Sequence, residues 1–399
     1  MQNNFNSIKK TDNINLSIYL IPFLIIIPKI NLISVSGFWQ GIRLEDIVTL
    51  FMLLYMVLNS KKYSLRLYDP SIKFYFFVSF ALFSYVVGHI SGISYGNADF
   101  VQIARMIEYC VIVLFFSNIN FDRENIKKII SVLKFLIIVN FIISVGQYYE
   151  IIGYYSSRGY HAPDYEYWKA FGIFSGSWEL SFITSISYFI IFLETKKKLN
   201  IYLILTLIIL FLAGTRGIQF PFILTILIMY FKNILQIQTK FKLFIYLIIF
   251  SLSCYFMYSY HNINLLFLIN TLIDLFLYQH VPDFSDLTSS EVVYYSWIHR
   301  LKDFLIFYQL MSTNLFTFLF GTGFTAIYYE SFIFRILCGT GIMGFFLLII
   351  FCFRLNIFII IFLIITGITL DFVSSFKQFL ILYFFFQYMR FYNKNDTSY

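Results

Sequence analysis

Residues 201–231 read IYLILTLIILFLAGTRGIQFPFILTILIMYF, two apolar runs joined only by Ala213-Gly214-Thr215-Arg216-Gly217. A helix needs about 20 mostly apolar residues to cross the hydrocarbon core of a bilayer. Runs of this kind recur along the whole chain, which is 59% hydrophobic and only 13% charged. The sequence therefore predicts an all-α polytopic integral membrane protein, with residues 1–399 forming one membrane domain.

The apolar runs predict about 12 transmembrane helices, centred near residues 24, 52, 82, 110, 138, 182, 206, 224, 250, 342, 362 and 382. Lysine-rich loops alternate with acidic or neutral ones, which places both termini in the cytoplasm. The first apolar run follows Lys9 and Lys10 without a small-residue cleavage site, so we expect a retained span and not a removed signal peptide. A large outer loop, 261–329, is expected between spans 9 and 10 with amphipathic helices at the membrane surface, and a shorter outer loop at 150–170.

Charge and cysteine usage exclude several kinds of site. The net charge of +8 fits an ordinary excess of lysine on the cytoplasmic side, so it does not indicate nucleic-acid binding. The four cysteines lie inside apolar runs without paired spacing, and the five histidines show no metal-ligand spacing. There is no phosphate-binding glycine loop of the Walker type. We therefore predict neither a metal nor a cofactor.

Arginine is distributed unusually in this topology. Six arginines fall on or near the outer side, where acids otherwise predominate: Arg43, Arg105, Arg158, Arg216, Arg300 and Arg335. A charge at membrane depth costs about 2.5 to 3.5 kcal/mol on insertion scales, so such residues are expected to serve a function. Arg216 stands at the outer end of its span; the alternative is an arginine that reaches lipid phosphate and holds the turn.

Other polar residues near these arginines are candidates for chemistry. Tyr328-Tyr329-Glu330-Ser331 places a carboxylate at the start of the tenth span, and Glu330 is a candidate general base; alternatively, Glu330 and Arg335 only neutralise neighbouring charges. In the 150–170 loop, Arg158 and His161 stand among aromatic residues, a composition that suits a sugar or, equally, an interfacial aromatic belt. Arg105 and Glu108 are three residues apart on one helix face and are expected to pair.

The order of short motifs resembles the O-antigen and capsular polysaccharide polymerase family, often called Wzy, within the superfamily that includes the O-antigen ligases. The motifs are RLED from Arg43, ARMIEYC from Ala104, FGIFSGSWELS from Phe171, AGTRG from Ala213, then Arg300, FGTGF, YES and CGTGIMG. Glu330 at the YES position, with no histidine after His299, favours a polymerase over a ligase.

The resemblance implies a glycosyltransferase of the bacterial inner membrane whose site faces the periplasm. It would move a growing glycan from undecaprenyl diphosphate onto a repeat unit carried on the same lipid, in lipopolysaccharide or related polysaccharide biosynthesis. A chain-length regulator and a flippase are implied as further partners. Arginines can stabilise a diphosphate leaving group without a metal ion. We assign Glu330, Arg216 and Arg300 to catalysis, and Arg335, Arg158, His161, Arg105 and Arg43 to substrate binding. The alternatives are an O-antigen ligase and a transporter, or flippase, of lipid-linked oligosaccharides.

Overall fold

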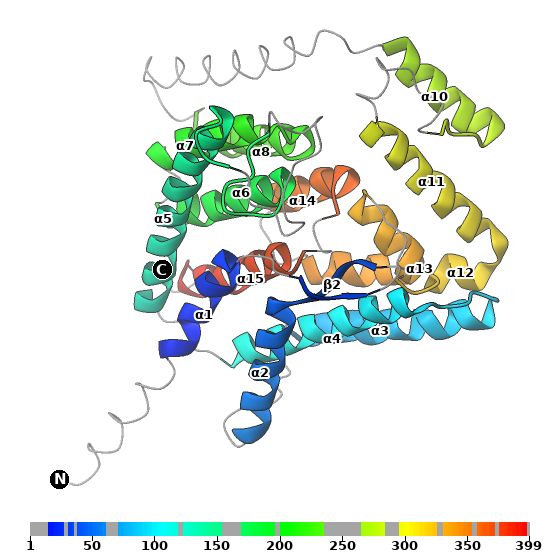
Figure 1. Ribbon diagram of the computed structural model, residues 1–399, viewed down its shortest axis with the longest axis horizontal. Coiled ribbons are helices and arrows are strands. Elements are labelled where there is room, and N and C mark those ends of the chain that lie inside the picture. The colour runs from blue at the N-terminus through cyan, green and yellow to red at the C-terminus, as the bar shows by residue number, and fades with distance from the viewer. Residues whose placement is uncertain are drawn as a thin grey trace.

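The computed structural model is mostly helical (Figure 1). It describes residues 15–27, 31–35, 38–60, 71–118, 123–153, 169–195, 200–234, 265–283, 295–324, 330–352, 357–371 and 375–396. The helices are α1 Asn15–Ile26, α2 Leu44–Leu58, α3 Ser71–Ile90, α4 Asn97–Ser117, α5 Arg123–Tyr148, α6 Ser177–Glu194, α7 Ile201–Ala213, α8 Arg216–Ile234, α10 Leu265–Tyr278, α11 Tyr295–Thr313, α12 Leu315–Phe320, α13 Phe332–Cys352, α14 Ile357–Thr369 and α15 Phe376–Asp396. Two strands, β1 Asn31–Val35 and β2 Phe38–Arg43, complete the described elements.

Membrane character is supported by the length and composition of the helices. Among the described residues, 4 helices are long and apolar enough to cross a membrane: α3, α4, α5 and α13. Several further helices, including α7 and α14, are as apolar but shorter. Helices occupy every predicted span centre except the one near residue 250, which lies outside the described residues. The chain is therefore a helical membrane protein, while the count of 12 spans and the orientation stay predictions.

The expectation of an all-α fold is wrong at residues 31–43. β1 and β2 pair antiparallel there, with Asn31 opposite Arg43 and Val35 opposite Phe38. Two short runs rich in β-branched and aromatic residues, separated by Ser36-Gly37, are a hairpin signal that the apolar-run reading overlooked. The hairpin matters for the site because it delivers Arg43 directly to the first turn of α2.

The core is organised around α6, which is buried along almost its whole length. Helices α5, α7, α8 and α15 pack against it (Figure 1). Serine and threonine recur on α6, at Ser181, Thr184, Ser185 and Ser187, and all four are buried. Small side chains of this kind let neighbouring helices approach closely in a membrane, where association depends on packing.

Helix α13 is broken within its length, at Gly341, whose φ is +63°. The segment after α12 pairs with the backbone just before that break: the Thr322 N–H donates to the Cys338 carbonyl at 2.9 Å, and the Gly323 N–H to the Gly339 carbonyl at 2.8 Å. A side chain at Gly341 would come within 2.5 Å of the Leu319 backbone. Glycine is therefore required there both by the positive φ and by the close approach.

The segment predicted as a large outer loop, 261–329, contains α10, α11 and α12 within its described residues. α10 and α11 pack on each other through a small core of their own, in which the Trp297 indole N–H donates to the Thr271 hydroxyl at 3.1 Å. In Figure 1 these two helices lie along one side of the molecule, away from α5. α11 and α12 both pack against α13, and Asp303 on α11 reaches the backbone just before the start of that helix.

Candidate functional site

Arg300 and Glu330 meet where α11 passes the start of α13. Arg300 Nε lies 3.7 Å from Glu330 Oε2, and the two side chains are 25% and 14% exposed. Arg300 also donates from Nη2 to the Thr369 carbonyl at 3.1 Å, at the end of α14. The ion pair is longer than a hydrogen bond and is reachable from solvent, so both groups can change partners.

Asp303, one turn further along α11, holds the YES segment in place. Its Oδ2 accepts from the backbone N–H of Glu330 at 2.9 Å and from that of Ser331 at 3.0 Å. The side chain is only 2% exposed. Burial raises the pKa of the Asp303 carboxyl to about 7, and the charges of Glu330 and Asp371 act in the same direction. Asp303 therefore fixes the backbone that carries Glu330.

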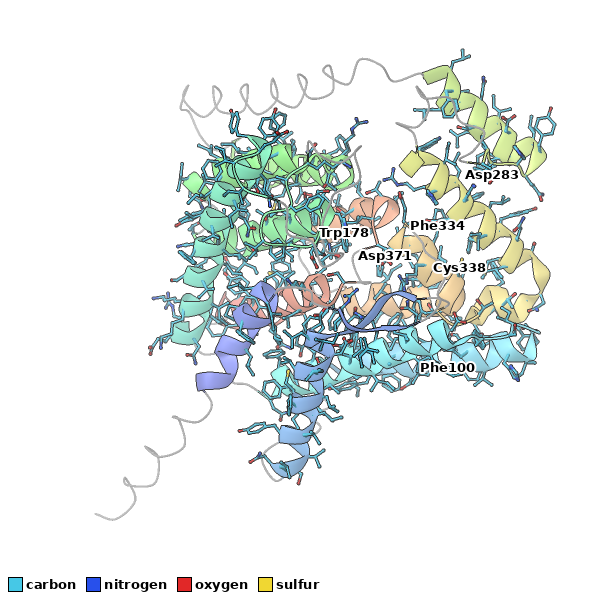
Figure 2. The ribbon with its side chains drawn as sticks, viewed as in Figure 1. Phe100, Trp178, Asp283, Phe334, Cys338 and Asp371 are labelled. Atoms are coloured by element: carbon cyan, nitrogen blue, oxygen red, sulfur yellow. The ribbon has the colours of Figure 1, made fainter. Side chains whose placement is uncertain are left out.

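Arg335 joins three separate elements. Its Nη1 pairs with Asp371, just after α14, and its Nη2 donates to Gln102 Oε1 on α4 at 2.8 Å. Figure 2 shows Asp371 in the interior, between the α13 and α14 ribbons, with Phe334 near it in this view. Only the planar fork of a guanidinium can hold two partners in this way.

Arg216 opens α8 and is exposed. The next residue, Gly217, offers its carbonyl to the Thr369 hydroxyl at 3.0 Å, and the Thr369 carbonyl is the one that Arg300 contacts. A side chain at Gly217 would meet the Thr369 hydroxyl at 2.4 Å, so glycine permits this approach. Thr369 thus connects the start of α8, and with it Arg216, to the Arg300–Glu330 pair.

Arg43 and Arg105 belong to a second, deeper cluster. Arg43 Nη1 lies 3.3 Å from Glu45 Oε1, and both side chains are almost fully buried. Arg105 Nη2 lies 3.8 Å from Asp46 Oδ1. Arg105 and Glu108 interact electrostatically, in line with their spacing on one helix face. Glu108 Oε1 also accepts from the Thr49 hydroxyl at 3.1 Å, and α2, which packs on α4, adds Asp46 as a second acid near Arg105.

The structure brings together most of the residues singled out in the sequence. Arg216, Arg300, Glu330 and Arg335 gather where α8, α11, α13 and α14 meet, and Arg43 and Arg105 lie along α4 and the hairpin. Arg158 and His161 lie outside the described residues.

Sequence reasoning missed Asp303, Asp371 and Gln102 at this site. Asp371 ends an apolar run, and a lone carboxylate at the end of a span was a usable signal. Asp303 and Gln102 had no comparable signal, because each is one polar residue among several on its helix. Within the described residues, no three His, Cys, Asp or Glu side chains form a group that could hold a metal ion.

Comparison of the chain with models of known protein families, with curated proteins and with solved structures gives no match.

Proposed function

We propose that this chain is a polysaccharide polymerase, a glycosyltransferase that moves a growing glycan from undecaprenyl diphosphate onto a lipid-linked repeat unit at the outer face of the inner membrane. The observation that carries the proposal is that two partly exposed ion pairs, Arg300–Glu330 and Arg335–Asp371, lie near each other, since Asp303 interacts electrostatically with both acids. A carboxylate beside arginines supplies both a proton acceptor and a binding group for a departing diphosphate.

The leaving group determines what the arginines have to do. The acceptor hydroxyl attacks the anomeric carbon of the donor glycan, a new C–O bond forms, and the bond from that carbon to the diphosphate oxygen breaks. Negative charge builds up on the departing undecaprenyl diphosphate. Guanidinium groups placed before the reaction stabilise that charge through paired hydrogen bonds, in the position that a metal ion takes in other transferases.

The Arg300–Glu330 pair couples donor binding to base release. Its separation of 3.7 Å makes it a loose pair, and a diphosphate carries more charge than one carboxylate. A bound diphosphate therefore takes Arg300 from Glu330 and leaves the carboxylate able to accept the proton of the acceptor hydroxyl. Asp303 keeps Glu330 in register throughout, because it binds the Glu330 and Ser331 backbone and not their side chains.

The proposal is tested in a strain that lacks the gene and is complemented with wild type, Arg300→Ala or Lys302→Ala. Lys302 is the matched control, since it lies on the same helix but pairs with the exposed Asp283 at 2.7 Å, away from the site. Surface polysaccharide is separated on a gel, and membrane fractions are immunoblotted to establish that each variant inserts.

Wild type and Lys302→Ala are expected to restore the ladder, while Arg300→Ala leaves acceptor with a single repeat unit. Bare acceptor with long glycan accumulating on the carrier lipid would instead identify a ligase. An unchanged ladder in the deletion strain would contradict both readings and favour a transporter of lipid-linked oligosaccharide.

A further inference from the structure

The cluster deeper than the Arg300–Glu330 site is centred on Glu45, in the first turn of α2. Glu45 is fully buried, at 0% exposure, and interacts electrostatically with three cations, Arg43, Arg105 and Lys377. Arg105 interacts more strongly with Glu108, and Lys377 with Glu179, so these two acids belong to the same cluster. These come from β2, α4 and the start of α15, so three parts of the chain far apart in sequence each contribute a positive charge.

Two of the three cations have hydrogen-bonding capacity that the protein does not use. Arg105 is 5% exposed, and none of its three guanidinium nitrogens has a hydrogen-bond partner within the described ranges. Lys377 is 1% exposed, and its Nζ likewise has no partner there; it lies 5.1 Å from the centre of the Phe174 ring. Burying an ionised group without hydrogen bonds is costly, so we expect a bound ligand to accept hydrogen bonds from both cations.

Unused acceptors lie beside these donors. Glu45 Oε2 and Asp46 Oδ1 are buried and, in the part of the chain that the structure describes, have no hydrogen-bond partner. Arg105 Nη2 lies 3.8 Å from Asp46 Oδ1, which is too long for a hydrogen bond. The cluster thus presents donors and acceptors together.

The presence of both unused donors and unused acceptors indicates which kind of ligand the cluster can bind. A phosphate or diphosphate only accepts, and it would be repelled by the two carboxylates. A hydroxyl group both donates and accepts, so a compound carrying several hydroxyls satisfies both kinds of unused group. We propose that Glu45, Asp46, Arg105 and Lys377 form a glycan subsite that holds a sugar of the substrate. The inference rests on the proposed function, since it assigns a second part of the same substrate.

The position of the subsite fits that role. Gln102, which contacts Arg335, and Arg105 are three residues apart on α4 and so face the same side of the helix. At 1.5 Å of rise per residue they are separated by about 4.5 Å along the helix axis. The deeper cluster therefore begins within one helical turn of the residue that Arg335 contacts.

Lys377→Met separates a ligand-binding role from a structural one. If Lys377 only stabilised the fold, an apolar side chain of similar length would be neutral or stabilising, because the cost of burying an unbonded ammonium disappears. If Lys377 binds a sugar, the same change weakens binding without harming the fold. Lys134→Met is the matched control, since Lys134 also lies over an aromatic ring, that of Tyr202 at 5.7 Å, but on α5.

The probe is the repeat-unit oligosaccharide released by mild acid from the lipid-linked fraction of the deletion strain. Its binding to purified full-length protein in detergent is measured by titration calorimetry, with undecaprenyl diphosphate as a second probe. Thermal unfolding of each variant establishes that it is folded.

Wild type and Lys134→Met are expected to bind the free oligosaccharide equally. Lys377→Met should bind it at least tenfold more weakly while retaining undecaprenyl diphosphate. The subsite proposal is wrong if Lys377→Met binds the oligosaccharide as well as wild type does. It is also wrong if wild type binds no free oligosaccharide while still forming a polysaccharide ladder. Neither result contradicts the proposed function. If the deletion strain still forms the polysaccharide ladder, the proposed function itself is wrong, whatever the calorimetry shows.

Discussion

The buried carboxyl of Asp303 should make the free energy of unfolding depend on pH. Burial, with the charges of Glu330 and Asp371, raises the pKa of Asp303 to about 7 from an ordinary 3.8. Between these two values the folded protein binds a proton that the unfolded chain has released, so the contribution of Asp303 to stability falls as pH rises. The slope is about 1.4 kcal/mol per pH unit near pH 5 and falls to half that value at the folded pKa, so the loss from pH 5 to pH 7 is about 2 kcal/mol, with little further change above pH 8.

Asp303→Asn removes this dependence, because an amide does not titrate and its oxygen can still accept from the Glu330 and Ser331 backbone. Thermal unfolding of detergent-solubilised protein, followed by circular dichroism from pH 5 to pH 9, compares the variant with wild type. The wild-type midpoint should fall relative to Asp303→Asn from pH 5 to pH 7 and level off above about pH 8. Asp283→Asn is the control: Lys302 lowers the pKa of Asp283, so its profile should run parallel to wild type over this range. Parallel profiles for wild type and Asp303→Asn would refute the reasoning.

Further changes test the packing and the geometry of the site. Gln147 is 1% exposed, and its Oε1 accepts from two consecutive backbone N–H groups at 2.8 Å; Gln147→Leu leaves both unpaired and should cost about 2 to 6 kcal/mol in chemical unfolding. Gly341→Ala should lower the thermal midpoint far more than Gly92→Ala, because both have positive φ but only Gly341 has backbone within 3 Å of the added carbon; equal losses would mean that φ alone matters. Arg335→Lys keeps the charge but cannot hold two partners with one fork, so the gel should show a ladder shortened toward single repeats, with normal membrane insertion.

Much of the fold follows from hydrophobic pattern alone. Every predicted span centre among the described residues lies in a helix, because a helix satisfies its backbone hydrogen bonds within the segment itself. The hairpin at 31–43 was missed because its two strands are short and only a two-residue turn signal separates them. The break at Gly341 was missed because it is imposed by the Leu319 backbone, which approaches from another part of the chain.

The candidate site was predictable in its cations and not in its partners. Arg300 and Arg335 are conspicuous because a charge near the membrane must have a reason to be there. Their partners are set by tertiary packing, which joins α11 to the start of α13 and α14 to α4. Arg105 illustrates the limit: helical spacing indicates its interaction with Glu108, but only the packing of α2 on α4 adds Asp46. Local pattern identifies the charged residue, and the topology selects what it meets.

The most direct test of the proposed function is a reconstitution. Purified protein in proteoliposomes is given the lipid-linked repeat unit with no nucleotide sugar, and released undecaprenyl diphosphate is measured together with the length of the glycan. We expect polymer to grow and one undecaprenyl diphosphate to be released for each new linkage. Glu330→Gln should abolish both polymer growth and diphosphate release. Movement of the lipid-linked unit across the bilayer with no diphosphate released would contradict the proposed function.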